Sequence, residues 1–178
     1  MDVLSPADTS ANAGVISAAD LQILVGRLTR LEDERAIVDT LHRYGQAADM
    51  GECEVWADLF VEDGVFLCVD RAGNQILREQ GRPALARWLA NFRANETLIT
   101  KHCVLAPVVR IEGGRASVKS YLTRISESAD RRAPPYLLLM GTYQDELVRC
   151  PDGAWRFESR TARTEAPLRD SGPRSGAG

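Results

Sequence analysis

The stretch from Arg30 to Val69 constrains the fold more than any other part of the chain. It reads RLEDERAIVDTLHRYGQAADMGECEVWADLFVEDGVFLCV, in which a long amphipathic helix precedes a short helix and a strand. Apolar residues recur at three- and four-residue steps from Ala18 to Ala48, so one stripe of the helix faces a core. Gly51 then supplies a left-handed cap that ends the helix. Such an opening predicts helices that pack against a sheet formed later in the chain.

The rest of the pattern predicts a third helix and then a series of strands. Gly26 is a candidate break within the long helical segment. A further helix opens at Gly81-Arg82-Pro83, because proline suits the first helical turn. The other predicted elements are a short helix at 53–60, a turn at 62–64, and strands at 65–69, 100–111, 115–126, 136–149 and 154–163. Helices followed by antiparallel strands predict an α+β fold, in which a strongly curved sheet wraps around the helices and encloses one concave pocket.

The sequence predicts one domain with a disordered segment at each end. Residues 1–17 are rich in Ala, Ser, Asp and Pro and lack periodicity, which predicts a disordered arm. Residues 166–178 predict a disordered tail for the same reason. Residues 18–165 then form a single domain, and a chain of 178 residues is long enough for one domain with a sizeable core.

Composition and charge argue against several kinds of partner. A net charge of −3 leaves no basic face for nucleic acid. No apolar run reaches the roughly 20 residues of a membrane helix, and the N-terminus lacks the basic start and apolar core of a signal peptide. The four cysteines are widely spaced without a CxxC pair, which favours reduced thiols in the cytoplasm over structural zinc. The sequence also contains no GxGxxG, GxxxxGKS/T or HExxH motif, so we expect no metal and no redox cofactor.

A histidine and an aspartate are the first candidates for catalysis. The imidazole of His102 is a side chain that can take and return protons. Asp49, at the end of the long helix, is the candidate partner that orients the ring and stabilises its charged form. The alternative from the sequence alone is a solvated aspartate at a helix end and a histidine on an edge strand. The other histidine, His42, lies two helical turns before Asp49 and is expected to face solvent.

Aromatic residues supply the other candidates. Tyr44 lies on the apolar stripe, where its phenol either donates a hydrogen bond to a ligand oxygen or meets a backbone carbonyl as a core tyrosine. Strand alternation places Tyr121 and Thr123 on one face and Tyr143 on a face with Asp145, but it does not decide which faces point inward. The residues expected to form core or pocket wall are Trp56, Phe60, Phe66 and Trp88.

Five segments together resemble the SnoaL-like branch of the nuclear-transport-factor-2-like superfamily over about residues 28–163. They are LEDERAIVDTLHRYGQAAD, WADLFVEDGVF, GRPALARWL, KHCVLAPVVRIEGGRASVKSYLTRI and GTYQDELVRCPDGAWRFESRTAR. The resemblance implies a cone-shaped α+β fold with Asp49 and His102 at the positions of the aspartate and histidine of its dehydratases. The tyrosine at position 44 is spaced from Asp49 as in the bile-acid dehydratase. Scytalone dehydratase has a second histidine on a strand, whereas His42 lies on a helix here, so the same substrate is not expected.

The resemblance implies a cofactor-independent enzyme that performs acid–base chemistry on a small, largely apolar or polycyclic molecule. Dehydration is the first choice, followed by isomerisation or cyclisation, with Tyr44, Asp49 and His102 as catalytic residues. The pocket wall would be formed by Trp56, Phe60, Phe66, Trp88, Tyr121, Thr123 and Tyr143. Two alternatives stay open, a non-catalytic binding or accessory protein and an epoxide-opening enzyme. A homodimer packed through the outer face of the sheet is also expected, because the apolar run at 136–140 would otherwise be exposed on at least one face.

Overall fold

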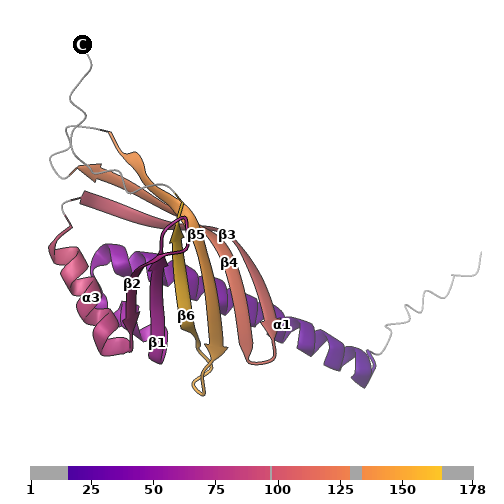
Figure 1. The fold of residues 1–178 in the computed structure, drawn as a ribbon. Coiled ribbons are helices and arrows are strands. Elements are labelled where there is room, and N and C mark those ends of the chain that lie inside the picture. The colour runs from indigo at the N-terminus through magenta and orange to yellow at the C-terminus, as the bar shows by residue number, and fades with distance from the viewer. Residues whose placement is uncertain (1–15, 97, 129–133, 166–178) are drawn as a thin grey trace, which may run out of the picture.

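Three helices and six strands form the part of the chain that the computed structural model describes, residues 16–96, 98–128 and 134–165 (Figure 1). The helices are α1 (Ala18–Met50), α2 (Cys53–Asp58) and α3 (Arg82–Ala94). The strands are β1 (Phe60–Val69), β2 (Gln75–Gln80), β3 (Leu98–Glu112), β4 (Arg115–Ser128), β5 (Tyr136–Arg149) and β6 (Trp155–Thr164). The predicted tail and the first 15 residues of the predicted arm lie outside the described residues.

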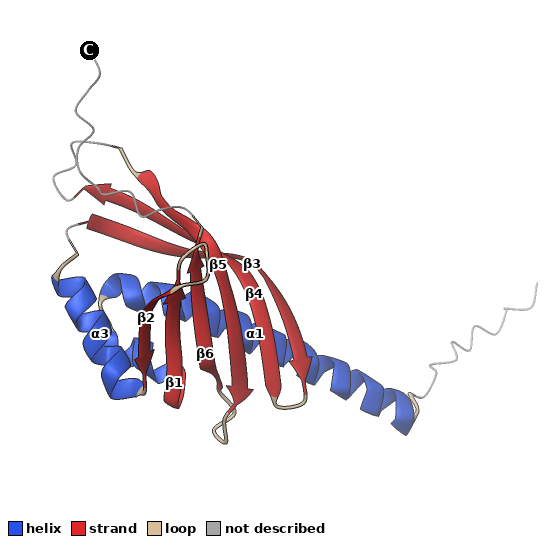
Figure 2. Ribbon diagram, viewed as in Figure 1, coloured by secondary structure: helices blue, strands red, loops and turns tan. Residues whose placement is uncertain are grey.

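The strands form one sheet in the order β2-β1-β6-β5-β4-β3. Neighbouring strands are antiparallel except β1 and β6, which are parallel. The pairing register shifts between Leu105 and Val108 and between Arg124 and Ile125, and such bulges bend the strands that carry them. Figure 2 shows β3, β4 and β5 curving over the helices. The predicted α+β fold with a curved, mostly antiparallel sheet is confirmed.

Capping fixes both ends of α1. The Ser17 hydroxyl accepts a hydrogen bond from the Asp20 backbone N–H at 3.1 Å, which satisfies a donor of the first turn. Gly51 adopts a left-handed conformation with φ 73°, and its N–H closes the last turn, as predicted. The predicted break at Gly26 is wrong. Helical residues flank Gly26 on both sides, and no atom from elsewhere lies within 4 Å of a Cβ built there, so one glycine does not interrupt the helix.

Two features of the early sheet differ from the prediction. β1 begins at Phe60, so the expected turn at 62–64 lies inside the strand, where the register with β6 shifts between Phe60 and Val65. β2 was not predicted. It is an edge strand of mostly exposed polar residues, and such a strand lacks the apolar alternation that reveals a half-buried one.

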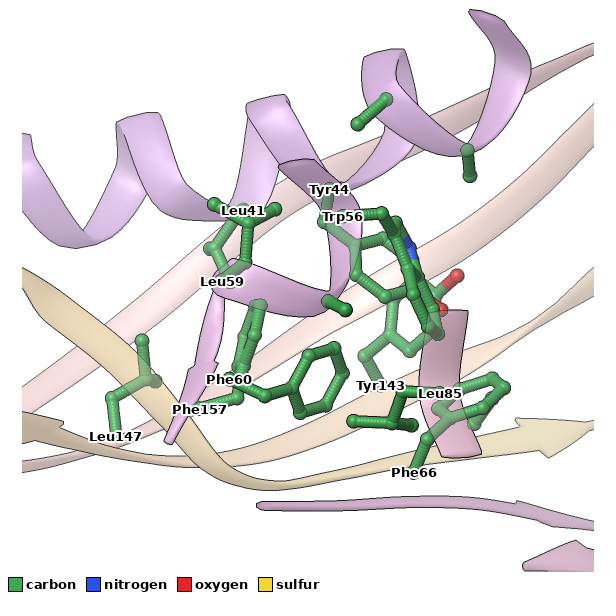
Figure 3. Close-up of a cluster of buried hydrophobic side chains, with 14 of the residues drawn as sticks. Leu41, Tyr44, Trp56, Leu59, Phe60, Phe66, Leu85, Tyr143, Leu147 and Phe157 are labelled. Carbon is green, nitrogen blue, oxygen red and sulfur yellow. The ribbon is translucent and has the colours of Figure 1, made fainter. Parts of the chain in front are cut away.

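The core lies between α1 and the concave face of the sheet and is rich in aromatic rings (Figure 3). The Tyr44 ring lies 5.2 Å from Trp56, 5.8 Å from Tyr143 and 5.9 Å from Phe157, measured between ring centroids. Aromatic pairs at such distances contribute roughly 0.5–1.5 kcal/mol beyond the area they bury. The last turns of α1 are therefore held by aromatic contacts from both α2 and the sheet.

Two hydrogen bonds fix the middle of α1 on the sheet. The indole N–H of Trp155 on β6 donates to the Asp33 carboxylate at 3.0 Å. The Thr40 hydroxyl donates to the Trp155 carbonyl, also at 3.0 Å. Every residue from 16 to 32 is exposed, so α1 begins its contact with the sheet at Asp33 and projects past it before that point (Figure 1).

Within the described residues, no helix is long and apolar enough to cross a membrane. All four cysteines are free and half-buried. The cytoplasmic location stays a prediction.

Apolar side chains gather on the outer face of the sheet. Cross-strand pairing places Leu105 opposite Tyr121 and Ile125 opposite Leu137, and all four side chains are at least 42% exposed. Exposed apolar patches of this kind mark interaction surfaces. They support the predicted homodimer, which stays a prediction.

Tyr121→Asp should convert the dimer into a monomer, because the substitution places a charge at the centre of this apolar face. Light scattering at micromolar concentration should give twice the chain mass for the unmodified protein and the chain mass for the variant. Val55→Asp is the matched control, since Val55 is an exposed apolar residue on α2, away from the sheet. A monomeric unmodified protein would contradict the homodimer.

Candidate functional site

An apolar cavity of about 270 Å³ lies between the helices and the concave face of the sheet. All three helices and all six strands contribute to its wall. Its lining residues are Tyr44, Ala48, Trp56, Phe66, Cys68, Ile76, Leu77, Trp88, Leu89, Phe92, His102, Leu122, Arg124, Leu139, Tyr143, Ala162 and Thr164. An apolar cavity with a few convergent polar groups is the usual form of a small-molecule site.

His102 lies in the wall of this cavity and contacts Asp49. The Asp49 carboxylate contacts His102 through both oxygens, one 2.6 Å from ring Nδ1 and the other accepting the His102 backbone N–H at 2.9 Å. The side chains are only 5% and 13% exposed, respectively. Because the carboxylate accepts the Nδ1 proton, the ring is held in one orientation and Nε2 is left for a ligand. The structure thus brings together the two residues that were predicted as partners.

Gly45 makes this contact possible. A Cβ built at Gly45 would lie 3.0 Å from the His102 carbonyl oxygen and 3.4 Å from the His102 Cβ. The missing side chain lets β3 lie against α1 one helical turn before Asp49. Gly45 was not among the predicted site residues. The sequence did hold a signal for Gly45. It is a glycine on the buried stripe of a helix, beside Tyr44 and Ala48, and a glycine inside a helix lowers stability unless a close contact requires it.

Tyr44 lines the same cavity from α1 and is almost wholly buried. Burial raises its pKa well above the usual value, and Tyr143 adds to the rise, whereas Arg160 opposes it. The phenol is therefore protonated at neutral pH and acts as a hydrogen-bond donor. His42, by contrast, is exposed on α1, as expected.

Tyr143 lies across the cavity on β5 and shares a buried cation with Tyr44. The guanidinium carbon of Arg160 on β6 lies 3.7 Å from the Tyr143 ring centroid and 4.0 Å from that of Tyr44. Burial raises the pKa of Tyr143 to about 12, although Arg160 lowers it. Figure 3 shows both tyrosine hydroxyls at the same end of the aromatic cluster. The positive charge of Arg160 opposes the rise in both tyrosine pKa values, and so it favours proton donation by the phenols.

Asp145 on β5 balances the charge of Arg160. The two groups form an ion pair at 3.3 Å and neither is exposed to solvent. Burial raises the pKa of Asp145 to about 6, although Arg160 opposes the shift. Arg160 was not predicted as a site residue, because a charged residue on a strand ordinarily faces solvent.

Only some of the predicted pocket-wall residues line the cavity. Trp56, Phe66 and Trp88 line the cavity together with Tyr143. Phe60 packs in the buried core against Tyr44 and Trp56 and does not line the cavity.

Tyr121 and Thr123 do not belong to the cavity, which corrects their predicted place in its wall. Their neighbours Leu122 and Arg124 line it, and side chains alternate along a strand, so Tyr121 and Thr123 point to the outer face of β4. The described residues contain no cluster of three His, Cys, Asp or Glu side chains that could hold a metal ion. The absence of a cofactor stays a prediction.

The comparison with known proteins agrees with the geometry. A family model described as a SnoaL-like domain matches residues 29–161. No curated protein matches the sequence.

Solved structures share the fold over most of their length. An NTF2-like protein with a cystatin-like fold from Novosphingobium aromaticivorans is 26% identical, with a TM-score of 0.72 over 88% of this chain and 95% of that one. The beta subunit of a putative aromatic-ring-hydroxylating dioxygenase from the same organism is 21% identical, with a TM-score of 0.68 over 78% and 92%. ActVI-ORFA from Streptomyces coelicolor is 20% identical, with a TM-score of 0.63 over 74% and 96%.

Gly45→Ala should disturb the Asp49–His102 contact, because the added methyl group displaces β3 from α1. The proton on His102 Nδ1 should lose its far-downfield resonance, as measured by nuclear magnetic resonance. Gly26→Ala is the matched control on the same helix, since no atom lies within 4 Å of its built Cβ. It should preserve the resonance and raise the free energy of unfolding by up to about 1 kcal/mol. An unchanged resonance in Gly45→Ala would show that the close approach is unnecessary.

Asp145 should stabilise the folded protein more at acidic pH than at neutral pH, the reverse of an aspartate whose pKa is lowered by folding. Its folded pKa of about 6 exceeds the ordinary value of 3.8, so the native state binds the proton first as pH falls. The free energy of unfolding of the unmodified protein should therefore rise relative to Asp145→Asn as pH falls from about 7 to about 3, by roughly 3 kcal/mol in total. Denaturant titrations at each pH measure the difference. A difference that stays flat or falls would contradict the assignment.

Proposed function

The chain belongs to the SnoaL-like family, and we propose that it is a cofactor-independent acid–base enzyme that acts on a small, largely apolar molecule. The observation that carries the proposal is His102 in the wall of an apolar cavity, with Asp49 bound to its ring. A carboxylate that holds one ring nitrogen leaves the other available as a base, which is the arrangement that proton transfer requires.

His102 would act first as the base. Its Nε2 would take a proton from a carbon next to a carbonyl group of the substrate, and Asp49 would stabilise the imidazolium that forms. In a dehydration, the imidazolium would then return the proton to the departing hydroxyl group, which leaves as water. In an isomerisation, the same proton would return to a different carbon. A positioned acid–base group typically contributes about 10²–10⁴-fold to the rate.

Tyr44 and Tyr143 would stabilise the negative charge that develops on the carbonyl oxygen. Both line the cavity and both have a raised pKa, so they remain donors at neutral pH. One donor of this kind is worth roughly 3 kcal/mol of transition-state stabilisation. The apolar wall excludes water and strengthens these interactions. Dehydration is the preferred reaction, followed by isomerisation or cyclisation.

Epoxide opening has less support than acid–base chemistry on a carbonyl compound. That reaction uses carboxylates to activate a water molecule, whereas no Asp or Glu is among the described residues that line the cavity. A binding or accessory role has one specific observation in its favour, the exposed apolar outer face of the sheet.

His102→Ala should reduce proton exchange at the carbon next to the carbonyl of β-tetralone more than tenfold, an effect typical of losing a general base. The exchange is followed in deuterated water by nuclear magnetic resonance, so it needs no knowledge of the natural substrate. Asp49→Asn should also slow it, because the imidazolium loses its balancing charge. Tyr44→Phe should slow it comparably if Tyr44 carries the oxyanion and less if it only orients the substrate.

His42→Ala is the matched control, since His42 is the only other histidine in the sequence and is exposed on α1. It should retain the full exchange rate. Full exchange activity in both His102→Ala and Asp49→Asn would rule out the proposed pair, and a binding or accessory role would then be favoured.

A further inference from the structure

The first half of α1 carries a row of leucines that lies open to solvent. Leu21, Leu24, Leu28 and Leu31 follow one another at steps of three, four and three residues, and we call them the leucine row. Each of the four side chains is between 47% and 63% exposed, although burial of leucine is strongly favourable. Figure 1 shows that this part of the helix projects past the sheet.

The leucine row points away from the sheet of its own chain. An α-helix turns by about 100° per residue, so the row lies roughly opposite the side of α1 that carries Ile37, Leu41 and Tyr44. Those three side chains are buried in the core. The predicted core-facing stripe therefore holds only for the second half of α1, and burial of the leucine row requires a partner other than this sheet.

The spacing of the leucine row is that of a coiled coil. Apolar residues at alternating steps of three and four form a seam along which two helices pack. The same side of α1 stays exposed beyond the row, at Arg35, His42 and Gln46, so a second helix has room to approach. Arg35 occupies the next position of the seam and is charged, so the apolar seam ends at Leu31.

The charges beside the seam favour a second copy of α1 in the parallel orientation. In a parallel pair, the residue before a seam leucine faces the residue five positions later on the other helix. This places Arg27 against Glu32 of the partner subunit, and the two-fold axis repeats the contact. In an antiparallel pair, Arg27 would face the partner's Arg27 and Asp20 would face the partner's Glu34. Two identical helices therefore bring opposite charges together when they are parallel.

The same segment has no surplus of positive charge for a membrane surface. Residues 16–32 contain two arginines, Arg27 and Arg30, and two acidic residues, Asp20 and Glu32. A helix that lies on anionic lipid is rich in Lys and Arg on its polar face. The balanced charge favours a protein partner.

We propose that the leucine row is a docking surface for the same row of a second copy, packed as a parallel two-stranded coiled coil. The row and the outer face of the sheet point in opposite directions, so this is a second self-association surface beside the expected sheet-to-sheet dimer. The seam spans about two heptads, fewer than an independent coiled coil needs, so the pairing is weak. It lies outside the cavity and does not depend on the proposed enzymatic function.

Leu24→Cys tests the pairing, because a parallel pair brings the two copies of position 24 together across the two-fold axis. Mild oxidation at about 300 µM chain should cross-link more than about half of the chains through this position. Ile23→Cys is the matched control, since Ile23 is 62% exposed but lies on the other side of the helix. Peptide mass spectrometry distinguishes these links from links through the native cysteines. Equal cross-linking at the two positions, or none at position 24, would overturn the proposal.

A mixture of Leu24→Cys and Leu28→Cys chains tests the orientation. A parallel pair joins each position to itself, whereas an antiparallel pair places position 24 opposite position 28. Links between positions 24 and 28 should therefore be the minor product. If they are the major product, the parallel coiled coil is wrong.

Arg27→Glu, introduced into Leu24→Cys, should slow cross-linking about fivefold, because repulsion replaces attraction on both sides of the seam. Adding Glu32→Arg should restore the rate. Arg30→Glu is the matched control, since it makes the same change of charge away from the leucine row. An equal loss in the control, or no recovery on adding Glu32→Arg, would contradict the proposed pairing of charges.

Vesicles of phosphatidylcholine and phosphatidylserine test the lipid alternative in a flotation assay. The unmodified protein should stay unbound, because residues 16–32 carry no net charge. Binding that Leu28→Asp abolishes would assign the leucine row to a lipid surface and end the proposal.

Tyr121→Asp separates the leucine row from the outer face of the sheet. Cross-linking of Leu24→Cys chains should persist when Tyr121→Asp is added, since the row lies on α1 and Tyr121 lies on β4. Loss of the cross-link would show that the sheet alone brings the chains together, and the leucine row would then have no pairing of its own.

Discussion

The contact between the end of α1 and the beginning of β3 organises the functional part of this protein. One carboxylate, Asp49, accepts both the backbone N–H and the ring N–H of His102. The first bond fixes the strand against the helix and the second fixes the imidazole, so Asp49 serves both the fold and the proposed chemistry. Gly45 permits the approach, and the hydrogen bonds between α1 and Trp155 fix the position of the helix along the sheet.

A second constraint lies beneath the cavity, where Arg160 and Asp145 are both fully buried. Burying two charges is expensive, and well-packed apolar residues often serve stability as well or better. The structure compensates by placing aromatic faces around the guanidinium. Burial of this ion pair therefore costs stability, but the charge of Arg160 lowers the pKa of both phenols, which an apolar pair would not do.

The sequence predicted the features that depend on local pattern. The stripe of α1, its glycine cap at Gly51 and five of the six strands follow from periodicity and turn residues. The inward face of β4 did not, because alternation gives two faces without saying which is buried, so Tyr121 and Thr123 were placed wrongly. Arg124, Arg160 and Gly45 matter through partners far away in sequence. Only the folded structure shows that Gly45 lies against His102, Arg124 beside Glu96 and Arg160 opposite Asp145.

The parallel pairing of β1 with β6 joins the first strand of the sheet to the last. The hydrogen bonds from α1 to Trp155 also involve β6, so the first helix cannot form these contacts before β6 is in place. A growing chain on the ribosome can form the β3–β4 and β4–β5 hairpins early, since these contacts are local. It cannot close the wall of the cavity until β6 has emerged. Until then the aromatic core is open to solvent, and chains that stop short of β6 are candidates for aggregation and degradation.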